Sequence, residues 1–206
     1  MKTVTISREF ASGGREFGEK LAKYLAYEYY DKEIISAIAS EKGLNENYIA
    51  SVIENGSFRN YSVPIARSFS LQPIFFNQQK IEIITAQEKV IKKIADTKNS
   101  VIIGRCADAI LEGYRTFNIF VYSDMASKLK RCIKYAPENE NLSEKELLKK
   151  IKQINKNRKD YYEVYTDKIW GAKENYHLCI NTAIMEIDEI VPFIGEYIKA
   201  YFKKEN

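Results

Sequence analysis

The fold is decided by one stretch near the start of the chain, VTISREFASGGREFG over residues 4–18. Its first three residues are β-branched, which is typical of a short strand. A loop of small residues follows, then a basic residue, and then a helical pattern. In a strand–loop–helix unit of this kind, backbone N–H groups and the helix N-terminus face an anion. The stretch therefore has the layout of a phosphate-binding loop.

The letters of this loop depart from the usual signature, G-x-x-x-x-G-K-[ST]. Glu9 stands at the first glycine, Gly14 keeps the second, Arg15 replaces the lysine and Glu16 replaces the hydroxyl residue. Gly13 and Gly14 still permit a close approach to an anion, because glycine has no Cβ and tolerates positive φ. Arg15 adds a bidentate fork that matches phosphate oxygens. A plain strand-to-helix turn is the alternative interpretation.

Composition places the chain among ordinary globular proteins. Its 206 residues, 45% hydrophobic and 29% charged, predict one domain. A net charge of +4 is too small for a nucleic-acid partner, where a concentrated basic face is expected. The absence of a membrane-length apolar run predicts no membrane association and a cytoplasmic location. The widely spaced Cys106, Cys132 and Cys179 predict buried free thiols, not a disulfide framework or a zinc site.

Five short apolar or β-prone segments alternate with helical patterns along the chain. These predicted strands cover residues 4–6, 27–30, 100–103, 117–122 and 177–181. The amphipathic segments between them include a long one over residues 76–98 and another from the Ser143 capping box to about residue 162. Such alternation predicts an α/β domain with a parallel sheet. Ligands of these sheets bind outside the carboxyl ends of the strands.

Charged residues follow two of the predicted strands directly. Gly104 and Arg105 end the third strand, so a guanidinium is expected in the ligand crevice. Asp31 follows the second strand and is expected to face the same crevice. Each residue has a simpler interpretation. Arg105 could pair with a neighbouring carboxylate. Asp31 could be the N-cap of the next helix, a role that is compatible with facing the crevice.

A basic and aromatic cluster lies in the long helix that starts near Ser143. Arg158 and Tyr162 share one face at i, i+4 spacing, as do Tyr161 and Tyr165. An arginine on a mobile arm can close over a phosphate and stabilise its charge during transfer. The alternative is that arginine stacked on tyrosine simply fixes a surface helix. The single histidine, His177, has no nucleophile beside it in sequence, so we interpret it as structural.

Taken together, these segments resemble the cytidylate kinase-like family, a branch of the P-loop nucleoside-monophosphate kinases. The resemblance rests on ISREFASGGRE at residues 6–16, YDKE at 30–33, IGRCAD at 103–108, RKDYY at 158–162 and NYHLCINT at 175–182. The segments come in the family's order and span nearly the whole chain. The resemblance implies the P-loop NTPase fold: α/β, a five-stranded parallel sheet with helices on both faces, an acceptor-binding insertion at residues 45–75 and a helical lid at 131–162, all within one domain over 1–206.

The resemblance also implies roles for individual residues. The donor phosphates would be held by Ser12, Gly13, Gly14, Arg15 and Glu16, with Glu16 also the candidate ligand for Mg²⁺. The acceptor would be bound by Asp31, Arg67, Arg105, Asp108 and Tyr162. The catalytic cations would be Arg15, Arg131 and Arg158, the last two from the lid.

The implied activity is ATP- and Mg²⁺-dependent phosphoryl transfer to a small acceptor, with a nucleoside monophosphate as the leading candidate. Transfer would be in line, without a covalent intermediate. Two alternatives stay open. Arg15 and Glu16 depart from the lysine and hydroxyl of the signature, which fits a nucleotide-binding sensor without turnover. The aromatic residues within 45–75 fit a kinase of a different small molecule.

Overall fold

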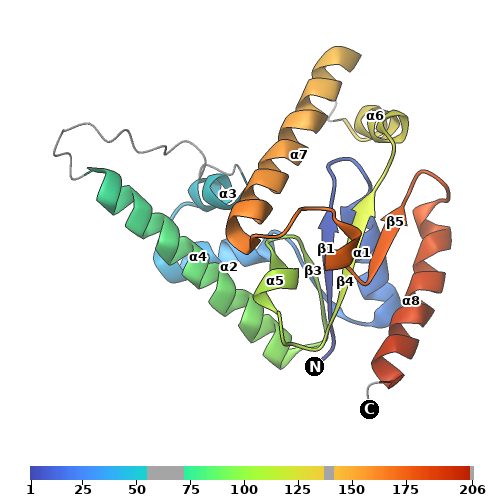
Figure 1. Ribbon diagram of the computed structural model, residues 1–206, viewed down its shortest axis with the longest axis horizontal. Helices are drawn as coiled ribbons and strands as arrows, with labels where there is room; N and C mark the ends of the chain where they lie inside the picture. Colours follow the sequence, from blue (N-terminus) through green and yellow to red (C-terminus); the bar gives the residue numbers. More distant parts are fainter. Residues whose placement is uncertain (55–71, 137–141, 205–206) are drawn as a thin grey trace.

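The computed structural model describes residues 1–54, 72–136 and 142–204, which form a five-stranded sheet with helices around it (Figure 1). The strands are β1 (Thr3–Arg8), β2 (Glu28–Tyr30), β3 (Ser100–Ile103), β4 (Thr116–Tyr122) and β5 (Leu178–Asn181). Their order is β2-β3-β1-β4-β5, and every neighbouring pair is parallel. The predicted α/β class and the parallel sheet are therefore confirmed, with β1 at the centre.

Eight α-helices and one 3₁₀ turn occupy the described part of the chain. They are α1 (Gly14–Leu25), α2 (Glu33–Lys42), α3 (Glu46–Glu54), α4 (Gln72–Thr97), α5 (Ala107–Ile110), α6 (Met125–Lys134), α7 (Glu144–Thr166), η1 (Lys173–Asn175) and α8 (Ile187–Lys204). The short α5 and η1 were not expected from periodicity, because neither is long enough to show a helical repeat. Within this part of the chain, no helix is long and apolar enough to cross a membrane.

Helices cover both faces of the sheet and give it two cores. On one face α1 and α8 pack on side chains such as Val101, Ile103 and Phe117. On the other face α2, α3, α4, α5 and α7 pack around Ile102. Successive residues of β3 thus point to opposite faces, both buried, as the apolar run at residues 100–103 predicts. On α4, Ile83 is buried whereas Ile81 is 62% exposed.

Local capping residues define where the helices begin. Asp124 accepts a hydrogen bond from the backbone N–H of Ser127 at the start of α6, and Ser143 forms a capping box with Glu146 at the start of α7. Asp31 is not an N-cap, because α2 is preceded by Lys32 and has no side-chain cap. The carboxylate of Asp31 is therefore available for another contact.

The region of the predicted lid consists of the end of α6 and most of α7, with residues 137–141 outside the described part. Both helices lie at the end of the sheet toward which the strands point (Figure 1). The predicted insertion at 45–75 comprises α3 and the beginning of α4, and residues 55–71, including Arg67, lie outside the described residues. Because the strands are parallel and β1 also ends there, the β1–α1 loop lies at this same end of the sheet. Ligands of parallel sheets bind at that end.

Candidate functional site

The loop between β1 and α1 has the backbone shape of an anion-binding turn. Gly13 is the N-cap of α1 with a φ of 78°, a conformation that glycine adopts without strain. A Cβ at Gly13 would lie 2.9 Å from Cζ of Arg131. Ser12 is fully buried, and its hydroxyl lies 2.9 Å from the carbonyl oxygen of Glu9 and 3.1 Å from that of Val121, to either of which it donates. The Ser12 side chain thus fixes the loop from inside the protein, and the neighbouring Gly13 and Gly14 line the larger of the cavities described below.

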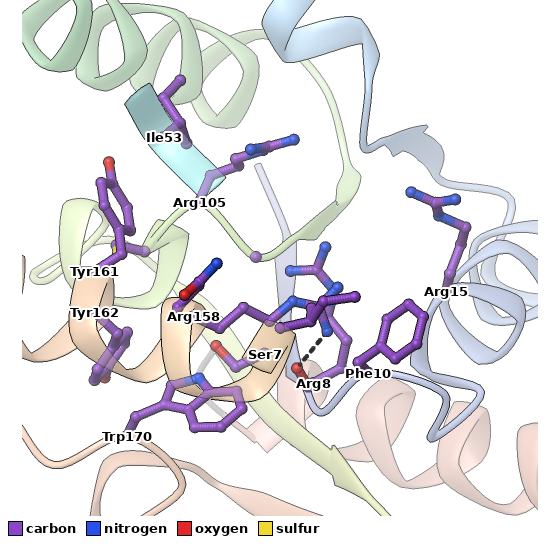
Figure 2. A pocket seen from close by; sticks show the side chains of 14 residues that line it. Ser7, Arg8, Phe10, Arg15, Ile53, Arg105, Arg158, Tyr161, Tyr162 and Trp170 are labelled. Carbon is purple, nitrogen blue, oxygen red and sulfur yellow. Dashed lines mark hydrogen bonds between the residues drawn. The ribbon is translucent and has the colours of Figure 1, made fainter. Parts of the chain in front are cut away.

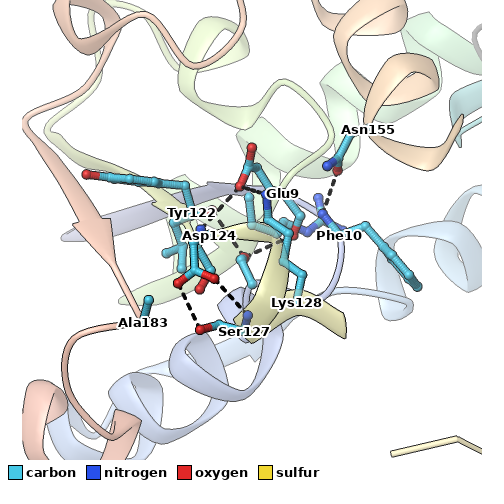
Figure 3. Close-up of polar contacts among 12 residues, drawn as sticks. Glu9, Phe10, Tyr122, Asp124, Ser127, Lys128, Asn155 and Ala183 are labelled. Carbon is cyan, nitrogen blue, oxygen red and sulfur yellow. Dashed lines mark hydrogen bonds and ion pairs between the residues drawn. The ribbon is translucent and has the colours of Figure 1, made fainter. Parts of the chain in front are cut away.

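The negative charge of Glu9, which stands at the position of the first glycine, is balanced by other groups of the protein (Figure 3). Its Oε2 lies 2.5 Å from Nζ of Lys128 and accepts a hydrogen bond of 3.2 Å from the backbone N–H of Ser123. The next residue, Phe10, donates its backbone N–H to Oδ1 of Asn155 on α7 at 2.6 Å. The loop is therefore joined to both α6 and α7, the helices of the predicted lid region.

Glu16, at the hydroxyl position, contacts two cations. Its Oε1 lies 2.8 Å from Nζ of Lys20, and its Oε2 pairs with the guanidinium of Arg131. Burial raises the pKa of Glu16, but the hydrogen bonds and charges of Lys20 and Arg131 outweigh it and hold that pKa below its ordinary value. The charge of Glu16 is thus balanced by Lys20 from the same helix and by Arg131 from α6.

The fit of Glu16 to a Mg²⁺ ion is limited by these contacts. Both carboxylate oxygens already accept from cations, so a metal ion would take the place of one of them. The described residues contain no group of three or more His, Cys, Asp or Glu side chains that could hold a metal. Mg²⁺ in nucleotide sites is bound through one or two carboxylates together with substrate phosphates. Glu16 thus matches such a site only as a single ligand that first releases Lys20 or Arg131.

Asp31 is a buried anchor for two arginines. Its Oδ2 lies 2.6 Å from Nε of Arg15, and its Oδ1 lies 3.9 Å from Nη2 of Arg8. The Asp31 side chain is 5% exposed, that of Arg8 14% and that of Arg15 58%. Asp31 therefore acts on the site by positioning guanidinium groups, one on each carboxylate oxygen.

Two cavities adjoin the loop. The smaller, about 370 Å³, is lined by Ser7, Arg8, Phe10, Arg15, Ile53, Gly104, Arg105, Cys106, Ile154, Asn157, Arg158, Tyr161, Tyr162 and Trp170. The larger, about 620 Å³, is lined by Arg8, Glu9, Phe10, Ala11, Gly13, Gly14, Arg15, Glu16, Arg131, Cys132, Tyr135, Ala136, Leu147, Lys150 and Arg158. Both volumes fall in the usual range for small-molecule sites. Because Arg8, Phe10, Arg15 and Arg158 line both, the two cavities meet at these residues.

The smaller cavity is strongly basic. Four arginines line it, and none of its described lining residues is Asp or Glu. Arg105 is 6% exposed and adopts a φ of +59° where the chain turns from β3 into α5. Figure 2 shows these arginines converging from the β1–α1 loop, the end of β3 and α7. A concentration of guanidinium groups with aromatic neighbours is suited to a small anion that carries a ring.

Arg158 connects α7 to the loop. Its Nη1 donates to the backbone carbonyl of Arg8 at 3.0 Å, and its guanidinium carbon lies 5.9 Å from the centre of the Phe10 ring. Tyr161 and Tyr165 stack with their ring centres 6.1 Å apart, so the predicted i, i+4 tyrosine pair is present. Arg131 reaches the loop from α6, since it pairs with Glu16 and lines the larger cavity. Both predicted lid arginines thus lie at the loop.

Asp108 and Tyr162 form a closed pair beside the smaller cavity. Tyr162 donates its hydroxyl to Oδ2 of Asp108 at 2.7 Å. Tyr162 lines the cavity, whereas Asp108, 8% exposed, is not among the lining residues. Burial raises the pKa of Asp108, and the hydrogen bond from Tyr162 offsets part of this rise. Burial, followed by the charge of Asp108, raises the pKa of Tyr162.

A pH dependence of stability follows from Asp108. The pKa of Asp108 is higher in the folded state, so the folded protein holds the proton of Asp108 more tightly than the unfolded chain does. The resulting stabilisation of the fold is complete below the pKa of the unfolded chain. It is lost as the pH rises through the pKa of the folded state. We expect Asp108→Asn, which does not titrate and still accepts from Tyr162, to lose less stability than wild type between pH 4 and pH 8. Urea unfolding at several pH values measures this, and parallel pH profiles of the two proteins would contradict it.

The structure adds residues that the sequence analysis did not select. Arg8, Phe10, Asn157 and Trp170 line the smaller cavity. Arg8 had a signal, because it ends β1 directly before the loop, whereas the others are recognised only from the packing of α7 against the loop. Among the cysteines, Cys106 is buried as expected, but Cys132 and Cys179 are partly exposed, and all three are free.

Comparison with solved structures identifies the fold. The chain is similar to an uncharacterised protein from Eubacterium ventriosum (26% identity, TM-score 0.68, covering 97% of this chain and 99% of that one). It is also similar to shikimate kinase from Bacteroides thetaiotaomicron, with 12% identity and a TM-score of 0.56 over 96% of this chain and 98% of that one. Shikimate kinase from Acinetobacter baumannii in complex with shikimate is similar at 16% identity and a TM-score of 0.51, over 97% of this chain and 93% of that one. No sequence match is found among curated proteins.

The parallel sheet, with the glycine loop at the centre of its carboxyl edge and two cavities beside that loop, has the arrangement of the P-loop kinase fold. The sequence profile of the cytidylate kinase-like family matches residues 3–184. The chain belongs to the cytidylate kinase-like family.

Proposed function

We propose that this protein transfers the γ-phosphoryl group of ATP to a small anionic acceptor, with a nucleoside monophosphate as the leading candidate. The observation that carries the proposal is the junction of the two cavities at Arg8, Phe10, Arg15 and Arg158. A donor in one cavity and an acceptor in the other would bring the reacting atoms together at this junction. Holding two reactants in line is the main contribution that such an enzyme makes.

The donor belongs in the larger cavity. The backbone of Gly13 and Gly14 and the start of α1 would supply N–H groups for the phosphates, while the buried Ser12, proposed for the same role from the family resemblance, holds the loop in shape. Arg15 and Arg131 add positive charge, and Arg131 reaches the phosphates by exchanging its contact with Glu16. Mg²⁺, which neutralises phosphate charge, would enter with ATP and be held by Glu16 together with the phosphate oxygens.

The acceptor belongs in the smaller cavity. Arg105 and Arg8 supply charge from the ends of neighbouring strands, and Asp31 sets the position of Arg8 and Arg15. Tyr162 lines the wall and is held by Asp108. Arg67, outside the described residues, remains a proposed acceptor residue on the basis of the family resemblance alone.

The chemical step requires little covalent participation by the protein. An oxygen of the acceptor forms a bond to the γ-phosphorus while the bond to the β–γ bridging oxygen breaks, and ADP leaves. A phosphate acceptor attacks as an oxyanion, so the step needs no general base. The arginines at the junction would stabilise the charge on the transferring group, with Arg158 and Arg131 approaching from the lid helices.

Two other functions have a specific observation in their favour. A small hydroxy acid, such as the shikimate in one structural neighbour, would suit a basic cavity of about 370 Å³. A nucleotide sensor without turnover would suit a loop whose Arg15 and Glu16 are already paired with protein groups. Both share the donor site with the leading proposal.

The proposal is tested by ADP release from ATP and Mg²⁺ in the presence of CMP, dCMP, UMP, AMP and shikimate. We expect at least one monophosphate to stimulate ADP release well above the rate without acceptor. Stimulation by shikimate alone would favour the hydroxy-acid kinase. If none stimulates, thermal unfolding with ATP and Mg²⁺ tests the donor site that all three functions share, since ligand at a hundredfold excess over Kd stabilises by about 2.7 kcal/mol. Stabilisation without turnover would fit the sensor or a kinase of an acceptor outside the panel.

A further inference from the structure

Two glycines that flank the site are required by a protein side chain. A Cβ at Gly14 would lie 2.5 Å from Cβ of Arg8, and a Cβ at Gly104 would lie 1.9 Å from Nη1 of Arg8. The Arg8 side chain therefore runs from the loop glycine to the glycine at the end of β3. The sequence analysis assigned Gly14 to the approach of a phosphate, and the contact with Arg8 gives this position a second constraint.

Arg8 is also held from two further sides. Asp31 lies 3.9 Å from its Nη2, and its backbone carbonyl accepts a hydrogen bond from Arg158 at 3.0 Å. Its side chain is only 14% exposed, yet it lines both cavities. Arg8 is thus a largely buried cation that lies beside both cavities before any ligand binds. Preorganised charge of this kind stabilises a transition state without reorganisation.

Arg15 stands at the lysine position but is placed differently. Its Nε contacts Asp31 at 2.6 Å, and its side chain is 58% exposed. A lysine at this position of the loop normally reaches the β- and γ-phosphates. With its Nε directed to Asp31, Arg15 is drawn toward the β2 side of the site. Of the two arginines beside the loop, Arg8 at the end of the central strand is therefore the more deeply buried cation.

We propose that Arg8 supplies the cation that the loop lacks at its lysine position, and that its guanidinium contacts the γ-phosphoryl group where the two cavities meet. This assignment rests on the proposed phosphotransferase function. A planar guanidinium can donate to two oxygens at once, so one residue can bridge the γ-phosphoryl group and the acceptor. Arg15 then contributes to binding at the rim of the cavities.

The test compares binding of AMP-PNP, which carries a γ-phosphoryl group, with binding of ADP, which does not, by calorimetry in the presence of Mg²⁺. We expect Arg8→Met to weaken AMP-PNP binding by roughly tenfold or more, the loss of one charged hydrogen bond. ADP binding should change less than about threefold by the same argument, because the contact is absent there. Arg15→Met should weaken both nucleotides to a similar extent.

The opposite outcomes are equally clear. An unchanged ratio of the two affinities in Arg8→Met would assign Arg8 to structure alone and overturn the inference, with the proposed function intact. The inference would also be overturned if AMP-PNP binding became weaker relative to ADP binding in Arg15→Met but not in Arg8→Met. If wild type binds neither nucleotide, the proposed function itself fails, and the inference fails with it.

A second variant protects the test against misfolding, since Arg8→Met leaves Asp31 without one of its partners. Arg8→Lys keeps a positive charge for Asp31 but removes the planar fork, so it should fold and show an intermediate loss of AMP-PNP binding with ADP binding retained. An AMP-PNP affinity equal to wild type in Arg8→Lys, together with a misfolded Arg8→Met, would contradict the bridging role. Lys98→Met, which removes an exposed pair with Glu28, is the control.

Discussion

Replacing Asp31 by alanine is expected to lower stability more than any other single change at the site, and to lower turnover as well. The carboxylate is buried and lies against Arg8 and Arg15, so its loss leaves a cation that is 14% exposed without this counter-charge. Removing one partner of a buried ion pair costs about 3–5 kcal/mol, and the half-exposed Arg15 places this case at the lower end of that range. For a domain of this size the midpoint of thermal unfolding should fall by roughly 5–10 °C.

Turnover in Asp31→Ala should fall by about 100-fold, because misplacement of a catalytic group by 1 Å is enough for such a loss. Steady-state kinetics with the best acceptor of the panel, at a temperature where the variant is folded, measure this effect. Glu28→Ala, in the strand β2 that precedes Asp31, removes only the exposed pair with Lys98 and should change stability by less than about 1 kcal/mol. Normal turnover in a destabilised Asp31→Ala would show that Asp31 supports the fold but does not position the arginines.

Replacing Arg158 by methionine is expected to reduce kcat by about 10³-fold, the lower end of the effect of a transition-state arginine in phosphoryl transfer. Arg158 lines both cavities and reaches the backbone of Arg8 from α7, so it can act on the group in transfer while α7 stays in place. Methionine preserves the length of the aliphatic chain and its packing near Phe10. The KM values should change far less than kcat if the interaction is made mainly in the transition state.

The neighbouring Lys159 provides the matched control. It lies on the same helix, its side chain is 53% exposed, and it pairs with Glu163 in an i, i+4 contact. Lys159→Met should therefore leave kcat within about twofold of wild type, as exposed pairs of this kind contribute little. A kcat loss of similar size in both variants would point to a general effect on α7, and retention of kcat in Arg158→Met would remove Arg158 from the chemical step.

The sequence predicted those features that depend on neighbours along the chain. The apolar run at residues 100–103 and the capping box at Ser143 correspond closely to β3 and the start of α7. The Gly13 turn also formed as the glycine-rich loop predicts. Such features are determined locally, because strand and helix periodicity and capping involve residues at most a few positions apart.

The amino-acid sequence does not indicate which oppositely charged side chains contact one another in the folded protein. Glu16 stands in the predicted loop, and its partner Arg131 lies 115 positions away. Asp31 does not cap a helix, and its carboxylate contacts Arg15 and Arg8. Any of the 32 basic residues could in principle have supplied these contacts, so no local pattern selects among them.

The sequence by itself thus determined a parallel α/β domain with a glycine-rich loop at the carboxyl edge of its first strand, together with the family to which that arrangement is similar. Only the tertiary structure decided that Arg8 passes between Gly14 and Gly104, and that Arg8 lines two cavities. The reason is physical. Backbone propensity and hydrophobic periodicity act over short separations, whereas the position of a buried charge depends on which strands become neighbours when the sheet assembles.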